Sequence, residues 1–518
     1  MGTIEADYLV IGAGATAMAF VDTLVSETSA TVVVVDRNHR PGGHWTTAYP
    51  FVRLHQPSAY YGVNSRPLGN DTIDTTGLNK GFFELAAGAE VCSYFDAVMQ
   101  QQLLPTGQVS YYPLSEYLGD GRFRTSGGDE ILVHTRRRIV DTTFVGITVP
   151  SMRPPPYAVA PDVDCVPPND LPASESHDSY VVVGAGKTAM DTCLWLLRHG
   201  VGPERLTWIK PRDAWLLNRA NVQPGPQFAK QVLADVSAQL KAVQQAESVD
   251  DLFARLSDAG SLTRIDDSIE PQMYRCAIVS DAELEQLRRI ENVVRMGHVK
   301  AIAPGRVTLD GGSLLTPGSA LYIDCTAVGL GRGDVTDVFA GDRITLQTVR
   351  TCQPVFSAAL IAHVEAAYGD DDTRNALCRP IPNPEVPLDW LRMMLTYNGN
   401  QVRWFDEPDM MAWLTPLGST SSAMRRRRSV RGRGRRSSAL CGRNSATPTT
   451  TSRSCSADYE QARQATVRPA TGPTPGAGPH TGRRCDGSVR RAGRPRRCGR
   501  ARAPARGLRP RPSKAGAR

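Results

Sequence analysis

The sequence lacks any long run of apolar residues. Its 518 residues contain no stretch near the ~18 consecutive apolar residues that a membrane-spanning helix needs. The N-terminal segment has no basic region ahead of an apolar core, so it does not resemble a secretory signal. We therefore expect a cytoplasmic protein without a membrane partner.

Closely spaced cysteines are also missing. Seven of the 11 cysteines lie in the first 423 residues, and none of these seven forms a CxxC or CxxxxC pair. A zinc knuckle or a thiol–disulfide redox centre needs such close pairs. We therefore expect scattered, reduced thiols and no metal ion.

Lysine is almost absent from the C-terminal segment. From Met424 to Arg518 there are 25 arginines, one lysine and three acidic residues, whereas the preceding 423 residues carry 34 basic and 49 acidic groups. A segment so poor in apolar residues cannot offset the entropy of ordering, so we predict a disordered basic tail. Arg, Ala, Gly and Pro have GC-rich codons, which favours out-of-frame translation as its origin. The alternative is a genuine basic arm that binds nucleic acid without sequence specificity.

A strand, a glycine-rich turn and a helix open the chain. DYLVI is a short apolar run, GAGATAMA forms the turn, and TVVVVD is typical of a buried parallel strand. Gly12 permits the tight turn, Gly14 lets the backbone approach a pyrophosphate, and Ala17 lets the helix pack on the strand. Asp36 ends the second strand, where it can accept hydrogen bonds from a ribose, and Arg37 stands beside it.

The same pattern returns about 170 residues later. Gly184, Gly186 and Ala189 repeat the spacing after the strand YVVV. A nucleoside-triphosphatase loop would need glycine at position 181, which is Val181, so that class is excluded. Lys187 lies beside the turn, where it either contacts the pyrophosphate or faces solvent.

Basic residues end the following strand of this second unit. The strand RLTWIK ends at Lys210, and Arg212 follows, where an NAD site would carry an acid. Basic groups at this place can pair with a 2′-phosphate, which favours NADPH over NADH. The alternative is that both are solvated surface charges.

A third motif, PGGHW at residues 41–45, follows the first ribose acid and precedes YPFVRLHQPSAYYGV. With the two glycine turns, this stretch resembles the flavin-containing monooxygenase-like group of FAD- and NAD(P)-binding oxidoreductases, over about residues 5–420. The resemblance implies that FAD contacts Gly12, Gly14, Ala17, Asp36, Gly43 and Trp45, with His44 between the last two. It implies that NADPH contacts Gly184, Gly186 and Ala189.

The implied architecture is α/β, with two Rossmann-like dinucleotide-binding domains, the NAD(P)H domain being inserted into the FAD domain. The expected bounds are 1–170 for the first part of the FAD domain, 178–328 for the NAD(P)H domain with a helical elaboration, 329–421 for the return to the FAD domain, and 422–518 for the tail. Residues 324–327 with Gly329 resemble the strand at which the chain returns.

The local patterns predict further elements. Residues 89–104 have helical spacing, and 109–145 read as a small antiparallel meander. Residues 226–295 look mainly helical, and 344–421 look like short strands with a helix near Ser357–Ala367.

The most polar cluster near the expected flavin ring is His55 with Arg53 and Gln56, and these are the candidate catalytic residues. His55 could donate to a flavin oxygen or shuttle a proton. The alternative is a histidine that fixes its loop by a backbone hydrogen bond. Asn64 and the pair Asn218–Arg219 are weaker candidates.

Two departures from the family pattern leave the reaction open. Phe144 and Gly146 begin the monooxygenase fingerprint FxGxxxHxxx(Y/F), but Pro150 stands in place of its histidine. The paired cysteines of disulfide reductases do not follow Gly43. We expect an oxidoreductase in which NADPH reduces FAD to act on a small organic substrate, as a monooxygenase or as a non-oxygenating reductase or oxidase. A catalytically dead, truncated flavoprotein is a third reading. The sequence predicts neither the substrate nor the oligomeric state.

Overall fold

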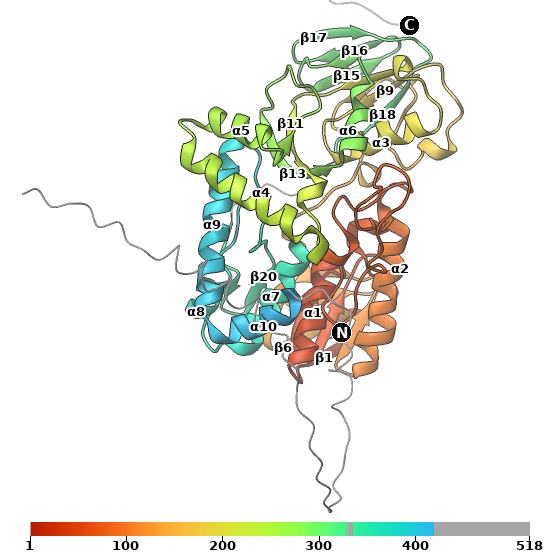
Figure 1. Cartoon of the computed structure of the whole chain (residues 1–518). Coiled ribbons are helices and arrows are strands. Elements are labelled where there is room, and N and C mark those ends of the chain that lie inside the picture. Colours follow the sequence, from red (N-terminus) through yellow and green to blue (C-terminus); the bar gives the residue numbers. More distant parts are fainter. Residues whose placement is uncertain (1, 328, 330–334, 419–518) are drawn as a thin grey trace, which may run out of the picture. The chain divides into compact units, whose positions relative to one another are not determined.

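The computed structural model describes residues 2–327, 329 and 335–418, which form an α/β protein (Figure 1). The fold class expected from the sequence, with two Rossmann-like units, is confirmed. The predicted basic tail, 422–518, and its disorder lie outside the described residues. Among the described helices, none is long and apolar enough to cross a membrane.

The first sheet has the strand order β19-β20-β6-β1-β2-β3, in which β20, β6, β1, β2 and β3 run parallel to one another and β19 pairs with β20 in antiparallel fashion. All four valines of β2 are buried, as expected for a parallel strand covered on both faces. An antiparallel hairpin extends the sheet from β6. The strands are β1 (Gly2–Ile11), β2 (Val32–Val35), β3 (Val109–Tyr112), β4 (Glu116–Gly119), β5 (Arg122–Arg124), β6 (Glu130–Asp141), β19 (Phe339–Ala340) and β20 (Arg343–Thr345).

Helices α1 (Ala15–Glu27) and α7 (Pro354–Ala367) lie side by side on this sheet, although more than 300 residues separate them (Figure 1). Both are rich in alanine, which allows the close approach, and both belong to one apolar core. The hydroxyl of Tyr8 in β1 donates to Glu365 Oε1 of α7 at 2.7 Å. The chain therefore leaves the first unit after β6 and rejoins it at β19.

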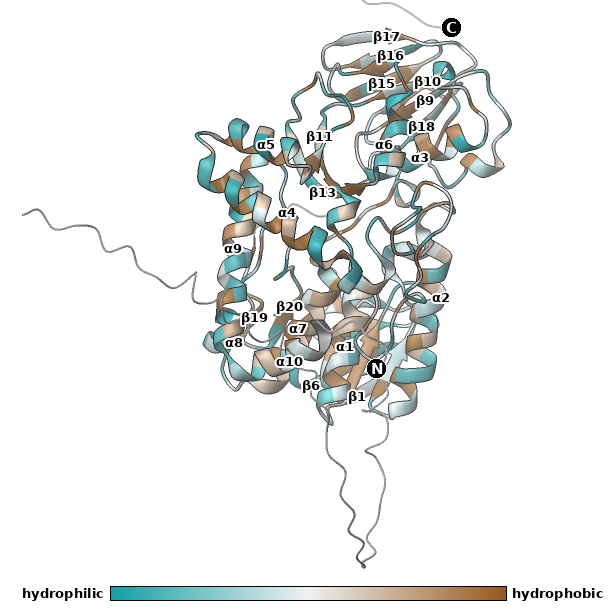
Figure 2. Ribbon diagram, viewed as in Figure 1, coloured by the Kyte–Doolittle hydropathy of each residue, from teal (hydrophilic) through white to brown (hydrophobic). Residues whose placement is uncertain are grey.

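The second sheet has the order β14-β10-β9-β18-β8, with all neighbouring strands parallel. Its central strands are buried along their whole length, and apolar residues are concentrated on them (Figure 2). The strands are β8 (Cys165–Val166), β9 (Tyr180–Val183), β10 (Leu206–Ile209), β14 (Val293–Val294) and β18 (Leu321–Asp324). Helices α3 (Lys187–Arg198) and α6 (Asp281–Arg288) pack on it.

The remaining described strands form two smaller sheets. One has the order β12-β11-β13 and the other β17-β16-β15-β7. Their strands are β7 (Ala158–Val159), β11 (Ala214–Asn218), β12 (Leu262–Thr263), β13 (Met273–Val279), β15 (Val299–Ala303), β16 (Arg306–Leu309) and β17 (Gly312–Leu315). The remaining helices used below are η1 (Gly43–Thr47), α2 (Gly88–Val98), α4 (Pro226–Gln245), α5 (Val249–Asp258), α8 (Asp371–Leu377), α9 (Pro387–Asp406) and α10 (Pro408–Gly418).

Three expectations for secondary structure are wrong in part. In 109–145, only β4, β5 and β6 pair in antiparallel fashion, because β3 and β6 also join the parallel sheet. Residues 226–295 contain strands β12, β13 and β14 as well as helices, and the described part of 344–421, which ends at residue 418, is mainly helical. Local pattern identifies apolar segments, but the pairing partner of a strand is set by contacts distant in sequence.

The expectation of scattered, reduced cysteines is also wrong for one pair. Cys276 and Cys352 form a disulfide across 76 residues of sequence. Spacing could not predict it, because β13 and the start of α7 meet only through the tertiary fold. The five other described cysteines are free thiols.

Candidate dinucleotide sites

The first glycine-rich turn joins the end of β1 to the start of α1. Gly12 has a φ of +98°, and a Cβ there would lie 2.7 Å from Thr142 Oγ1. Glycine therefore fits this turn where any other residue would be strained. Ala17 is buried beneath the turn, whereas Gly14 is only half-buried and leaves its backbone accessible.

The second turn, between β9 and α3, has the same construction. Gly184 has a φ of +142°, and a Cβ there would lie 2.8 Å from the carbonyl oxygen of Cys325. Gly186 is exposed, and no atom lies within 4 Å of its would-be Cβ. Ala189 is fully buried. In both turns, the first glycine presses on the end of a neighbouring parallel strand and the second is accessible.

Helices α1 and α3 both begin at a glycine, with no side chain capping the first turn. Gly14 and Gly186 are the N-caps, and neither first turn contains an acidic residue. Helices α5, α6 and α8 are capped by the side chains of Ser248, Ser280 and Asp370, whereas α4 also begins at a glycine, Gly225, without a side-chain cap. The first N–H groups of α1 and α3 and the positive ends of their dipoles are thus suited to an external anion.

Asp36 lies beside the first turn, at the end of β2. Its carboxylate accepts hydrogen bonds from the backbone N–H groups of Ala13 and, at 2.6 Å, Asn38. Burial raises the pKa of Asp36 above its usual value, although these two bonds act in the opposite direction. Asp36 therefore fastens the turn to β2. Its contact with a ribose stays a prediction, as does a cofactor contact of the exposed Arg37.

Helix η1 places the PGGHW motif directly on the first turn. Gly43 has a φ of +58°, and a Cβ there would lie 3.0 Å from the Cα of Gly14. Trp45 Nε1 donates to the hydroxyl of Tyr61 at 2.8 Å, which fixes the indole. Burial lowers the pKa of the neighbouring His44 to about 4, so its imidazole is neutral near pH 7.

Lys187 connects the second turn to the loop that follows η1. Its ammonium forms an ion pair with Asp191 and lies 3.4 Å from the carbonyl oxygen of Arg53. The hydroxyl of Tyr49 also donates to Asp191, at 2.8 Å. Burial raises the pKa of Asp191, against the opposing effect of Lys187. Contact of Lys187 with a pyrophosphate stays a prediction.

The two basic residues expected to select NADPH have acidic partners. Lys210 is buried, forms an ion pair with Asp213 and lies over the ring of Trp208, 4.8 Å from its centroid. Burial lowers the pKa of Lys210 even though Asp213 opposes the shift. Arg212 is more accessible and lies 2.9 Å from Glu385. Neither contact tests the 2′-phosphate hypothesis, but Arg212 is the more accessible of the two cations.

The candidate catalytic loop is held from several sides. His55 Nδ1 accepts a hydrogen bond from the backbone N–H of Ile278 at 3.1 Å. Gln56 Oε1 accepts one from Gln353 Nε2 at 3.1 Å. Arg53 is exposed and donates to a backbone carbonyl oxygen, that of Leu85. The structure therefore brings segments from β13 and the start of α7 onto His55 and Gln56.

The electrostatic state of His55 follows from its surroundings. Burial lowers its pKa to about 3, and the nearby Lys187 and Arg219 act in the same direction. A neutral imidazole whose Nδ1 accepts a hydrogen bond carries its proton on Nε2. Nε2 makes no hydrogen bond with any residue the structure describes, so His55 presents an N–H donor.

Arg219, only a weak candidate from the sequence, lies at the centre of this polar region. It is 1% exposed, and its guanidinium contacts Glu283 at 2.7 Å, Asn79 Oδ1 at 3.2 Å and the carbonyl oxygen of His55 at 3.4 Å. Its partners lie 64 to 164 residues away, so no local pattern could have revealed the cluster. Asn64 instead donates to Thr23, and Asn218 caps the turn that carries Arg219.

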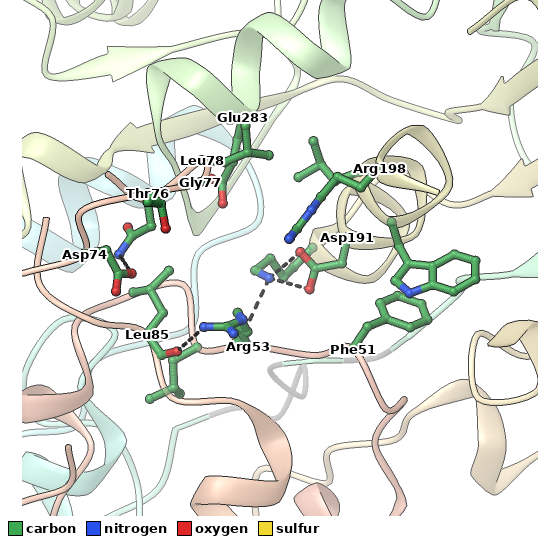
Figure 3. A pocket seen from close by; sticks show the side chains of 15 residues that line it. Phe51, Arg53, Asp74, Thr76, Gly77, Leu78, Leu85, Asp191, Arg198 and Glu283 are labelled. Carbon is green, nitrogen blue, oxygen red and sulfur yellow. Dashed lines mark hydrogen bonds and ion pairs between the residues drawn. The ribbon is translucent and has the colours of Figure 1, made fainter. Parts of the chain in front are cut away.

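A cavity of about 280 Å³ opens beside this cluster (Figure 3). Phe51 and Trp195, stacked with ring centroids 5.3 Å apart, provide an aromatic wall. Arg53, Asp191 and Arg198 contribute charged groups (Figure 3). Arg198 forms no ion pair or hydrogen bond within the described ranges. The cavity therefore combines an aromatic wall with charged groups of both signs.

Two parallel sheets, each ending in a glycine turn and an uncapped helix, define a protein with two Rossmann-like units. Residues 10–64 match the family model of the NAD(P)-binding Rossmann-like domain. The uncharacterized protein Rv2000 of Mycobacterium tuberculosis is 62% identical over 413 residues, which cover 80% of this chain and 77% of that protein. The uncharacterized protein Mb2023 of Mycobacterium bovis matches to the same extent. The chain belongs to the family of these mycobacterial proteins.

Solved structures of flavin enzymes also resemble the chain. The open crystal structure of cyclohexanone monooxygenase is 13% identical, with a TM-score of 0.45, over 80% of this chain and 99% of that one. The flavin-containing monooxygenase from Stenotrophomonas maltophilia is 14% identical, with a TM-score of 0.41, over 70% of this chain and 99% of that one.

Proposed function

We propose that this protein is an FAD-dependent oxidoreductase that uses NADPH. The observation that carries the proposal is the pair of uncapped helix starts, Gly14 of α1 and Gly186 of α3, at the ends of separate parallel sheets. Ligands of open parallel sheets bind beyond the carboxyl ends of the strands, and such helix starts suit diphosphates. Two such sites in one chain favour two electron carriers.

The first turn suits FAD. Gly43 and Gly14 lie in contact, so the backbone of both can flank a diphosphate, and the indole of Trp45, two residues after Gly43, is fixed by Tyr61. The resemblance of PGGHW to the flavin-containing monooxygenase-like group favours FAD here. A bound FAD would supply the redox chemistry, since it can accept a hydride from a nicotinamide and pass the electrons to an acceptor. The chain binds the diphosphate and orients the ring.

The second turn suits NADPH. The open space at Gly186 allows a diphosphate to approach the first N–H groups of α3. Arg212 is the better candidate for a 2′-phosphate because its side chain is 29% exposed, whereas that of Lys210 is 2% exposed. To make that contact, Arg212 would have to leave its ion pair with Glu385.

Among the candidate catalytic residues, we assign His55 the role of a hydrogen-bond donor. Its low pKa disfavours a proton shuttle through the imidazolium near pH 7, whereas its Nε2–H is already formed. Gln56 and Arg219 hold the loop that presents it. Arg53 and Arg198 line the cavity proposed for the small organic substrate.

The reaction that we propose is oxygenation of that substrate, as in the flavin monooxygenases that the sequence resembles. A non-oxygenating reductase is the second candidate, and Pro150 favours it. Pro150 is buried at the start of a 3-10 helix and offers no N–H donor where the family fingerprint has a histidine.

The test uses the purified full-length chain incubated with FAD. We expect it to retain FAD through gel filtration and the flavin to bleach when NADPH is added without air. Oxygen is then admitted in the presence of a panel of amines, sulfides and ketones. The amounts of oxygenated product and of hydrogen peroxide are measured. Peroxide alone would favour the reductase. Failure to retain FAD or to oxidise NADPH would contradict the proposal and favour the catalytically dead reading.

A further inference from the structure

The Cys276–Cys352 disulfide connects the two segments that hold the His55–Gln56 loop. Ile278, whose N–H donates to His55 Nδ1, is two residues after Cys276 in β13. Gln353, whose Nε2 donates to Gln56, immediately follows Cys352 at the start of α7. One covalent bond thus joins both anchors of the candidate catalytic loop.

The backbone is distorted at both ends of this bond. Cys276 has a φ of +55° and Cys352 a φ of +50°, a conformation that is unfavourable for any residue with a Cβ. They are two of only five non-glycine residues with positive φ in the part of the chain that the structure describes. Such conformations persist where surrounding structure imposes them, often at functional sites.

A bulge in β13 brings Cys276 to its partner. The pairing of β13 with β11 shifts so that residues 275–277 of β13 oppose the single residue Leu216 of β11. An irregularity that adds residues to one strand of a pair changes the direction of the side chains it carries. After the bulge, Ile278 returns to regular pairing with Leu217 and donates to His55. The cross-link therefore lies within the irregularity, and the His55 contact is made by the residue that directly follows it.

The two sulfurs differ in accessibility. Cys276 is 4% exposed, in an apolar cluster that includes Trp215 and Phe253, whereas Cys352 is only half-buried at the edge of that cluster. An external thiolate would therefore attack Cys352 Sγ more readily than Cys276 Sγ.

We propose that Cys276–Cys352 is a redox-controlled modification site that positions His55 and Gln56. In the disulfide form, β13 and the start of α7 are held together and both loop contacts are made. A dithiol reductant supplies two electrons and two protons, so the S–S bond breaks, two S–H groups form and the dithiol becomes its own disulfide. The two anchors then separate and the loop loosens. The effect of the disulfide on the position of His55 and Gln56 does not depend on the proposed function. Its effect on electron transfer rests on that function.

The first test follows backbone hydrogen exchange in the full-length chain without added cofactor. Non-reducing peptide mapping after alkylation should show the 276–352 cross-link in oxidised protein. Treatment with dithiothreitol should speed exchange at the Ile278 amide by about tenfold or more, with smaller increases over 53–58, and leave residues 180–190 unchanged. Cys276→Ser, Cys352→Ser and the double variant should all match the reduced protein. Cys165→Ser, which removes a free thiol, should match the oxidised protein.

Three outcomes would overturn the proposal: both cysteines alkylated in oxidised protein, a cross-link whose reduction leaves Ile278 exchange unchanged, or a uniform rise in exchange over the whole chain. The last would make the bond a general stabiliser. His55→Ala, which removes the acceptor, should abolish the effect of reduction at Ile278.

A second arm measures NADPH oxidation by FAD-loaded protein before and after reduction. We expect a change in kcat of several-fold that His55→Ala removes, with little change in the KM for NADPH. An unchanged kcat would overturn the claim that the disulfide affects electron transfer. The claim that it positions His55 and Gln56 would still be decided by the hydrogen-exchange result. A chain that binds no FAD would refute the proposed function but not the cross-link, because the exchange arm needs no flavin.

Discussion

Gly14 and Gly43 face one another so closely that a Cβ on Gly43 would lie 3.0 Å from the Cα of Gly14. The contact joins the first glycine turn to the PGGHW motif, two segments separated by 28 intervening residues of strand, helix and loop. It places two glycine backbones at the start of α1, where the proposal puts a diphosphate.

Replacement of Gly43 by alanine should therefore reduce FAD retention. The new Cβ would press on Gly14, and the φ of +58° is unfavourable for alanine, so the chain should also lose about 1 kcal/mol or more of unfolding free energy. Flavin content after gel filtration and urea denaturation measure the two effects. Gly107→Ala, at a positive φ of +72° but with nothing within 4 Å, is the matched control. Equal flavin content in both variants would contradict the prediction.

The two glycines of the second turn should give opposite phenotypes. Gly184→Ala should lower the unfolding free energy by more than about 1 kcal/mol, because its Cβ meets the Cys325 carbonyl at a φ of +142°. Gly186→Ala should fold normally, since its Cβ has open space, but should raise the KM for NADPH by obstructing the diphosphate. Thermal denaturation and steady-state kinetics separate them. A Gly186→Ala enzyme with an unchanged KM would show that no diphosphate binds there.

Substitutions of Lys210 and of Arg212 should have different effects on nucleotide preference and on stability. Arg212→Ala should weaken NADPH by about tenfold relative to NADH, the usual cost of losing a charge-assisted hydrogen bond. Lys210→Met should mainly change stability, because its ammonium is buried against Asp213. The ratio of kcat/KM for the two nucleotides is the measurement. An unchanged ratio in Arg212→Ala would refute its phosphate role.

Stability should fall in mild acid through His55 and His44. Their folded-state pKa values, about 3 and about 4, lie below the ordinary 6.5, so the unfolded chain binds more protons over this interval. The contribution of these two histidines to the free energy of unfolding should be highest above pH 6.5 and decline toward pH 4, by up to about 1.4 kcal/mol per pH unit for each histidine. Urea denaturation across this range should show a shallower decline for His55→Asn. The exposed His134→Asn is the control, and equal slopes for both variants would contradict the assignment.

Both glycine turns could be predicted from sequence because their chemistry is local. The positive φ of Gly12 and Gly184 and the burial of Ala17 and Ala189 follow from spacing within a few residues. The parallel strands were also recognisable, since runs such as the four valines of β2 are typical of strands covered on both faces.

The surroundings of His55 could not be predicted, because each contact spans a long stretch of sequence. Ile278 lies 223 residues from His55, and Gln353 lies 297 residues from Gln56. The pairing of Lys210 with Asp213 is local, but only the fold determines that Lys210 is buried. The disulfide likewise depends on a bulge in β13 that leaves no mark in cysteine spacing.

The most direct test of two separate dinucleotide sites is calorimetric titration of FAD and of NADP⁺ into the apoprotein and into Gly14→Val and Gly186→Val. The account predicts that the unmodified chain binds one of each, that Gly14→Val loses FAD but keeps NADP⁺, and that Gly186→Val loses NADP⁺ but keeps FAD. Both ligands lost together in either correctly folded variant, or competition of FAD and NADP⁺ for one site, would contradict it.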